Sequence, residues 1–453
     1  FPGVSFTAHG GCCGVIIGKK RRPRKNAEKA EIRRIASKKV VDIPAFLRYS
    51  IQSFRNEFHN DEQRRSVVDA MDDSGADPGA FGQLISYIAH AAPATRRPAE
   101  GNEAYLRPEI GFTPRWYADA IPSLEFGRRW HTDPAYRADS VIAMARETTR
   151  RFGARARIGV LQQDGRPTDL ITGVFGALLV PAIYGAPIWW QERDWPWTEH
   201  GQHLTDEQVD ALEPPNLDNN PFWQAFMEQV AWIAQRVPRL EGFINWQSVL
   251  NSGYRLRGEQ IFTDMVEVPE RVYNLFDCLA TTMIDGAQRL YAVQAAHGVH
   301  LDHFTVSNCL VNMLSPHFYA RFVMPYDRML AEEFASLGIH NCAWKADPYV
   351  PYYAAIANVS YIDMGLESNL AAAKDALPRP RRALMYTPMD TANKSSAQIR
   401  ADLERIACDY GPCDLVCADI DIDTPDKRVM EIIDLCEEIS ERYSNQSPNL
   451  LIS

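Results

Sequence analysis

The sequence lacks several features that would identify the class of protein at once. It has no uninterrupted apolar run of about 18 residues, so no membrane span is predicted; the longest apolar stretch, 173–190, contains Pro181, Gly185 and Pro187. Positive charge is not in excess, since 48 Lys and Arg stand against 58 Asp and Glu and the net charge is −10. This balance argues against a nucleic-acid partner. No internal repeat is found, and no glycine-rich phosphate loop follows an early strand, which disfavours a doubly wound nucleotide-binding sheet.

Cysteine is present but not in a disulfide pattern. The nine cysteines are an odd number scattered over 453 residues, which favours a reducing compartment. Residues 1–25 lack the long apolar segment of a secretory signal. We therefore predict a cytoplasmic protein without a membrane partner.

The first 115 residues differ from the rest in composition and in the pattern of apolar residues, and are predicted to be an N-terminal extension. Residues 1–40 hold adjacent cysteines, Cys12 and Cys13, and then a basic run at 19–25. A solvated arm is favoured there over a metal- or anion-binding tail, because adjacent cysteines chelate one ion poorly together. Residues 43–92 show helical apolar spacing, and residues 93–115, rich in Pro, Arg and Gly, are predicted to be a linker.

From residue 116 to 453, short apolar runs alternate with amphipathic segments, the pattern of βα units. The predicted strands are Ile158–Gln162, Leu178–Ile183, Gly242–Trp246, Val299–Phe304, Gly338–Cys342, Val359–Met364, Arg382–Tyr386 and Asp414–Ala418. The predicted helices include Pro221–Arg236, Pro269–His297, Pro316–Ser336 and Ser396–Asp409. Eight strands with interposed helices predict a closed (β/α)8 TIM barrel in an α/β protein.

Two of the predicted strands end in metal-binding residue types. His340 and Cys342 are two positions apart, so on an extended strand their side chains point to the same face. Cys417 ends the last predicted strand, and a closed barrel would bring it to the same rim. Two sulfurs and one imidazole suit Zn²⁺. The competing interpretation is that these cysteines are small buried apolar residues.

Three protein ligands leave a fourth zinc position open, which is typical of a catalytic site. Zinc removes the proton of a bound thiol, and a thiolate attacks a methyl group far better than a thiol does. The chemistry implied by this ligand set is alkyl transfer to sulfur.

From about Arg157 to the C-terminus the sequence resembles the uroporphyrinogen decarboxylase superfamily, and within it the zinc-dependent corrinoid:thiol methyltransferases. The resemblance is carried by the segments Leu256–Gln260, Glu267–Glu270, Leu314–Pro316, Met324–Tyr326, His340–Cys342, and Cys417 with Asp423–Pro425. It implies one zinc per chain held by His340, Cys342 and Cys417. It also implies a methyl-corrinoid donor on a partner protein and a small thiol acceptor of the coenzyme M type.

Glu367 falls where similar methyltransferases have an acidic residue that holds zinc until the thiol arrives. Asp363, Cys309 and water are the other possibilities for the fourth ligand. Two positions depart from the pattern, since Ala343 and Val416 stand where the family has glycine. The arginine-rich motif of true decarboxylases is not recognisable, which disfavours porphyrin decarboxylation.

Further residues at predicted strand ends are candidates for substrate chemistry. Asp302 and His303 are predicted to be catalytic, as groups that orient substrate or donate a proton. The predicted substrate-binding residues are Asp194, Trp195, Asn245, Gln247, Asn308, Trp344 and Lys345. Of these, Asp194 and Trp195 suit a planar or cationic group, and Lys345 suits an anionic tail.

Two other functions remain open at this stage. One is a metal-free decarboxylase of the same superfamily, which would need several cationic side chains to hold carboxylates. The other is a non-catalytic barrel subunit that docks on a corrinoid protein through the N-terminal extension. Homo-oligomers are compatible with the sequence.

Overall fold

The structure is a computed structural model that describes residues 84–86, 98–99, 101, 103–153, 167, 169–198 and 201–446. These residues all belong to one compact unit. The basic arm, the expected strand 158–162 and most of the expected helical stretch 43–92 lie outside the described residues. No helix among the described residues is long and apolar enough to cross a membrane.

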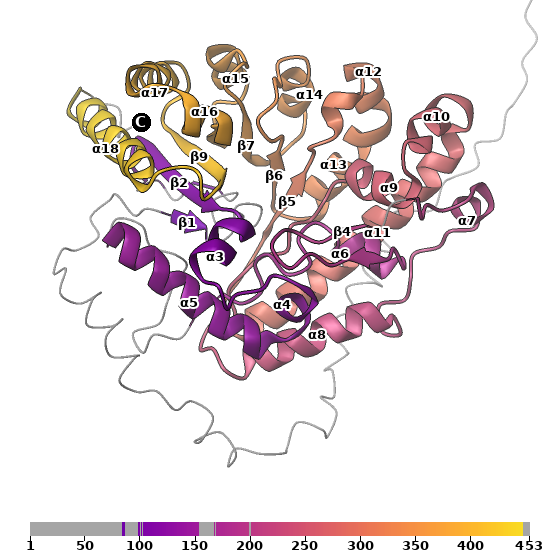
Figure 1. Ribbon diagram of the computed structural model, residues 1–453. Helices are drawn as coiled ribbons and strands as arrows, with labels where there is room; N and C mark the ends of the chain where they lie inside the picture. The colour runs from indigo at the N-terminus through magenta and orange to yellow at the C-terminus, as the bar shows by residue number, and fades with distance from the viewer. Residues whose placement is uncertain are drawn as a thin grey trace, which may run out of the picture. The chain divides into compact units, whose positions relative to one another are not determined.

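The centre of the unit is a parallel sheet of seven strands in the order β1-β2-β9-β8-β7-β6-β5 (Figure 1). Their bounds are β1 Leu84–Ser86, β2 Leu106–Phe112, β5 His303–Ser307, β6 Ser336–His340, β7 Val359–Gly365, β8 Arg381–Met385 and β9 Cys413–Ile420. Single parallel bridges join Gln247 to Ser307 and Asp169 to Glu241, continuing the sheet beyond β5. The α/β prediction is confirmed, whereas closure into a barrel is not among the pairings of the described residues.

Three late strands agree with the sequence prediction, because β7 and β9 cover the expected ranges and β8 matches its range to within one residue at each end. Two expected strands are wrong. The run 178–183 forms the helix α6 (Leu179–Ile183) with every residue buried, so its sequence carries no periodicity that separates helix from strand. The run 242–246 is irregular between the two bridges of Glu241 and Gln247.

Strand β2 occupies a stretch that the sequence predicted to be linker. All seven of its residues are buried, and it pairs with β9 from Leu106 opposite Cys413 onward. The strand contains Pro108 and Gly111, which are typical of a linker, and the charged residue Arg107. Arg107 is accommodated by a buried ion pair with Asp414, at 2.8 Å.

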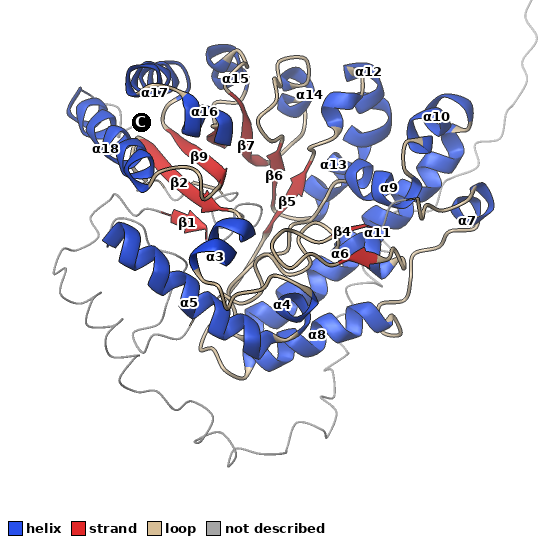
Figure 2. Ribbon diagram, viewed as in Figure 1, coloured by secondary structure: helices blue, strands red, loops and turns tan. Residues whose placement is uncertain are grey.

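The helices surround the strands: α13 packs against β5 and β6, α16 against β9, and α18 against β2 (Figure 2). The N-terminal helices are α3 Pro114–Ala120, α4 Arg128–Thr132, α5 Pro134–Phe152, α7 Asp206–Asp210, α8 Pro221–Ala234, α9 Val249–Arg257, α10 Gln260–Glu267 and α11 Pro269–Ala296. The later ones are η5 Val311–Met313, α12 Pro316–Phe318, the π-helix η6 Tyr319–Val323, α13 Met324–Glu333, α14 Val350–Ala354, α15 Leu370–Ala376, α16 Pro388–Asn393, α17 Ser396–Tyr410 and α18 Asp426–Gln446. A short antiparallel pair, β3 (Ile188–Trp189) and β4 (Trp197–Thr198), lies apart from the main sheet.

Capping residues explain why the predicted helices begin where they do. Ser315 accepts a hydrogen bond from the Phe318 amide and precedes Pro316, as the sequence indicated. Ser395 and Gln398 form a reciprocal capping box at α17. The predicted helices α8, α11 and α17 are confirmed, and the one predicted from Pro316 is interrupted by the π-helical turn η6.

The two faces of β9 belong to different parts of the core. Leu415 and Cys417 pack into the large core cluster. Val416 and Ala418 pack into a small cluster with Tyr361 of β7 and two residues of β8. Alternate residues therefore face opposite sides of the sheet, which decides what each can reach.

Candidate metal centre

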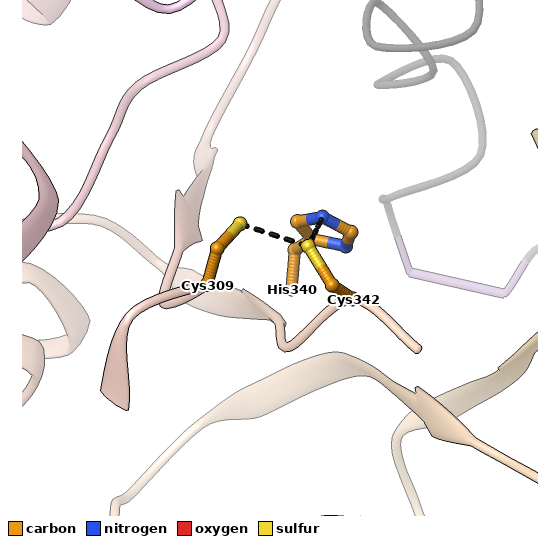
Figure 3. A group of neighbouring side chains, drawn as sticks. All are labelled: Cys309, His340 and Cys342. Atoms are coloured by element: carbon orange, nitrogen blue, oxygen red, sulfur yellow. Dashed lines mark hydrogen bonds between the residues drawn. The ribbon is translucent and has the colours of Figure 1, made fainter. Parts of the chain in front are cut away.

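Three soft ligands converge at the carboxyl ends of two neighbouring strands (Figure 3). They are Cys309, His340 and Cys342, whose donor atoms all lie within 4.8 Å of one another. The Cys342 Sγ is 2.9 Å from the Cys309 Sγ and 3.1 Å from the His340 Nε2. His340 ends β6 and is buried, whereas both thiols are partly exposed.

Strand pairing and a backbone turn bring these residues together. Ser307, the last residue of β5, is paired with His340, and the Asn308 amide donates to the His340 carbonyl at 2.7 Å. This contact fixes the segment that carries Cys309 beside β6. Cys342 adopts a left-handed backbone conformation with φ of 60°, unusual for a residue with a side chain. The strand thus ends earlier than predicted, and a turn places Cys342 next to His340.

The orientation of His340 is fixed by Asp363 on the next strand. The His340 Nδ1 lies 2.6 Å from the Asp363 Oδ2, which also accepts from the Tyr361 hydroxyl at 2.9 Å. The other carboxylate oxygen accepts from the Asn341 amide at 2.6 Å. Because a carboxylate only accepts hydrogen bonds, Nδ1 carries the proton and Nε2 offers its lone pair beside the thiols. Asp363, considered as a fourth ligand, therefore holds the histidine instead.

A second buried carboxylate supports the loop that carries Cys309. The Asn308 side chain donates to Asp327 at 2.9 Å, and the Tyr319 hydroxyl of the π-helix donates to the same oxygen at 2.8 Å. Burial raises the pKa of Asp327 to about 7. Asn308, predicted to bind substrate, is completely buried and holds this loop in place.

Cys417 is not part of the group, which corrects the predicted ligand set. It packs on the face of β9 that belongs to the large core cluster. His340 contacts Asp363 instead. Asp363 also accepts a hydrogen bond from Tyr361, which belongs to the small cluster and not to the large one. Burial raises the pKa of the Cys417 thiol to about 12, and its side-chain partner is Thr391. Cys309, and not Cys417, is the residue that lies beside His340 and Cys342.

The three ligands form part of the wall of a pocket of about 520 Å³, within the range of small-molecule sites. Three predicted substrate-binding residues, Trp195, Asn245 and Gln247, line this pocket. The Asn245 side-chain oxygen accepts from the Ser307 hydroxyl at 2.9 Å and from Gln247 at 3.2 Å. That these residues bind substrate stays a prediction. The other lining residues include Trp197, His203, Asn251, Tyr254, Arg255 and Ser307.

The two predicted catalytic residues lie at the wrong end of their strand. β5 begins at His303 and ends at Ser307, so Asp302 precedes the strand and His303 is its first residue, whereas the pocket is at its carboxyl end. The prediction placed the strand too early along the chain. His303 is buried against Phe243, with ring centroids 5.8 Å apart.

Four other predicted site residues do not line the pocket. Glu367 is exposed after β7 and is not among the converging ligands. Lys345 is largely exposed and pairs with Asp347 at 3.3 Å. Asp194 accepts a hydrogen bond from the next amide in its own exposed turn. Trp344 packs edge-on against Tyr349.

Sequence reasoning missed Arg255 of α9, which lines the pocket with its guanidinium 4.1 Å from the centre of the Trp197 ring. No local sequence pattern distinguishes Arg255 from Arg257 on the same helix, which forms an ordinary ion pair with Asp264 at 2.8 Å.

The donor group fits zinc. Two thiols and an imidazole are ligands that zinc prefers, at distances of about 2.0–2.3 Å. Ligands at those distances lie roughly 3–4 Å apart in a tetrahedral site, so small side-chain rotations would let the three atoms share one ion. The carboxylate behind the histidine is the usual outer partner of a zinc ligand.

Comparison with solved structures shows a fold that this chain shares. No family model and no curated protein matches the chain. A solved methyltransferase from Methanosarcina mazei superposes with a TM-score of 0.51 at 12% identity, covering 83% of this chain and 98% of that one. The chain shares its fold with this methyltransferase. A B12-independent methionine synthase from Shewanella sp. W3-18-1 gives a TM-score of 0.37 at 9% identity, over 68% of this chain and 89% of that one, too low to support an inference.

Proposed function

We propose that the protein is a zinc-dependent methyltransferase that moves a methyl group from a methyl-corrinoid, carried by a partner protein, to a small thiol. The observation that carries this proposal is the convergence of Cys309, His340 and Cys342 in the wall of a pocket. The fold shared with a solved methyltransferase is consistent with it.

The roles of the residues follow from their contacts. Cys309, Cys342 and the His340 Nε2 would hold one zinc ion, with Asp363 fixing the histidine tautomer. Bound zinc would leave a fourth position open for the thiol and lower the pKa of that thiol. Asn245 and Gln247 lie in the same pocket, where their amides can hydrogen-bond the acceptor.

The reaction balances without a further reagent. The acceptor thiol loses its proton on binding, and its sulfur attacks the methyl carbon. A carbon–sulfur bond forms as the cobalt–carbon bond breaks. The electron pair of that broken bond stays on cobalt, so methyl-cobalt(III) becomes cobalt(I) and the thiol becomes a methyl thioether.

The first test combines metal content with turnover in the full chain. We expect about one zinc per chain by mass spectrometry, and thiol-dependent loss of the methylcobalamin absorbance as cobalt(I) forms. Cys309→Ala and Cys342→Ala should lose both zinc and turnover while circular dichroism stays native. A folded wild-type protein that takes up no zinc would overturn the proposal.

Two further measurements address the alternatives. A decarboxylase needs several cations to hold carboxylates, but Arg255 is the only Arg or Lys among the described residues that line the pocket. Loss of carbon dioxide from uroporphyrinogen by the zinc-free protein would favour that function. A stable corrinoid-protein complex with zinc bound but no methyl transfer would favour a non-catalytic subunit.

A further inference from the structure

We infer that Tyr319 and Tyr353 are positioning residues of the candidate metal centre. Together they hold the two thiols, Cys309 and Cys342, at a separation that lets both bind one ion. The inference rests on the proposed function for the identity of that ion as zinc. It gives a role to the π-helical turn η6, which interrupts the helix predicted from Pro316 and begins with Tyr319. Such turns are frequent at functional sites.

Each thiol of the group is held through the asparagine that precedes it in the sequence. Asn308 precedes Cys309 and Asn341 precedes Cys342, and both asparagines are completely buried. A buried amide that loses a hydrogen-bond partner is costly. The partners of these two asparagines therefore restrict where the thiols can lie, and in both cases the partners include a buried tyrosine.

Tyr353 supports the turn that carries Cys342. The Asn341 side chain donates from Nδ2 to the Asp363 carbonyl at 2.9 Å, which leaves its oxygen to accept from the Tyr353 hydroxyl at 2.7 Å. The Asn341 backbone amide donates to the Asp363 carboxylate at 2.6 Å. With its backbone and side chain both held, Asn341 keeps the next residue in its left-handed conformation. Tyr353 thus closes the hydrogen-bonded frame that places Cys342 beside His340.

Tyr319 supports the segment that carries Cys309. The Tyr319 hydroxyl and the Asn308 side chain both donate to the same oxygen of Asp327, at 2.8 and 2.9 Å. Asp327 is buried, so these donors take the place of water around its carboxylate. The position of Cys309 therefore depends on Tyr319 through one shared acceptor.

The two tyrosines contact each other, so the two thiols share one support. Their ring centroids are 5.4 Å apart with an angle of 72° between the planes, an edge-to-face pair. Both side chains are completely buried, and they come from different elements, η6 and α14. Closely packed interiors leave little room for such rings to shift. The two sulfurs, 2.9 Å apart, are thus attached through two asparagines to one packed pair of tyrosines.

The competing role of the two tyrosines is general support of the core, because a buried hydrogen-bonded hydroxyl stabilises any fold. The two roles predict different results. A tyrosine that only supports the core changes the free energy of unfolding and leaves the separation of the sulfurs as it is. A positioning tyrosine also changes the affinity for any reagent that must bind both sulfurs at once.

The test measures two affinities in Tyr319→Phe and Tyr353→Phe, which keep the rings and remove one hydroxyl each. Competition with a chromophoric chelator gives the zinc affinity. The second probe is phenylarsine oxide, which condenses with two neighbouring thiols and releases water. It is titrated into the metal-free full chain, and only binding that is absent from Cys309→Ala is counted. We expect both affinities to fall about 10-fold in each variant, the low end for outer partners of metal ligands.

Tyr326→Phe is the matched control. Tyr326 is also buried and donates to a carboxylate, Asp277 at 2.8 Å. Among the described residues, its hydrogen bonds go to Asp277 and Tyr273 and not to the segments that carry the thiols. Urea unfolding should show a loss of stability similar to that of the other two variants, while both affinities stay within about twofold of the wild type.

The outcomes separate the inference from the proposed function. Unchanged affinities in Tyr319→Phe and Tyr353→Phe, or equal losses in Tyr326→Phe, would overturn the inference and leave the proposed function standing. A wild type that binds the arsenical but no zinc, with weaker arsenical binding in both variants, would support the inference and overturn the proposed function. Circular dichroism checks the fold, and if one variant does not fold the other gives the same decision.

Discussion

His340 and Asp363 lie on adjacent strands and are joined by a 2.6 Å contact between Nδ1 and a carboxylate oxygen. This contact fixes which imidazole nitrogen faces the two thiols. The candidate metal centre therefore has two layers: Cys309, His340 and Cys342 offer the donor atoms, and β7 provides the carboxylate that orients one of them.

Removing the carboxylate should weaken the metal site without abolishing it. In Asp363→Ala the imidazole loses its fixed tautomer and orientation, so we expect zinc affinity to fall about 10- to 100-fold. Competition with a chromophoric chelator measures this. Tyr361→Phe, which removes one other hydrogen bond to the same carboxylate, is the control and should cost less. Unchanged zinc affinity in Asp363→Ala would show that His340 is not a ligand through Nε2.

The replacement of Cys417 by Cys309 in the ligand set is tested by a pair of alanine variants. Cys417 is buried in the large core cluster, so Cys417→Ala should keep about one zinc per chain and lose roughly 1–2 kcal/mol of unfolding free energy through the small cavity. Cys309→Ala should lose zinc. Metal analysis and urea unfolding give the two readouts, and the opposite pattern, with zinc retained in Cys309→Ala and lost in Cys417→Ala, would restore the ligand set derived from spacing.

The difference between the predicted ligand set and the group of side chains that the structure brings together has a physical cause. The spacing of His340 and Cys342 is local, so the sequence can indicate that they meet. Cys309 joins them only because β5 pairs with β6 in the register Ser307 to His340, and this register is not written in any short motif. Cys417 looked equivalent because it ends a strand, but the alternation of β9 turns it to the other face.

The prediction agreed better with the structure where the local sequence determines the secondary structure. Most residues of the strands β7–β9 are buried, and α8, α11 and α17 begin at caps or at proline. β2 was missed because its segment is rich in Pro, Arg and Gly, and only the tertiary partner Asp414 explains why Arg107 can lie in a buried strand. The pocket cation Arg255 was missed because its environment comes from β4 and the strand ends.

The turn that carries Cys342 depends on a glycine of the neighbouring strand. A Cβ on Gly365 would overlap with the Ala343 carbonyl oxygen, so Gly365→Ala must displace the Ala343–Trp344 peptide, one residue after Cys342. We expect zinc affinity to fall by at least about 10-fold in the chelator competition. Gly127→Ala is the control, because its Cβ would meet the nearest atom at 3.6 Å. Native zinc affinity in Gly365→Ala would mean that this turn tolerates the displacement.

Asp327 should make stability depend on pH near neutrality. Burial raises its pKa from 3.8 to about 7, so the folded state favours the protonated form. The contribution of this group to stability is full below about pH 4 and is lost as the pH rises through about 7, at up to roughly 1.4 kcal/mol per pH unit. Asp327→Asn cannot ionise, so the wild type should lose stability relative to it between about pH 4.5 and 6.5.

Tyr319→Phe removes a hydrogen bond that lowers the pKa of Asp327, and it should extend the loss of stability to higher pH. Urea unfolding at several pH values with excess zinc measures all three proteins, and parallel curves for the wild type and Asp327→Asn would show that Asp327 is already charged in this window.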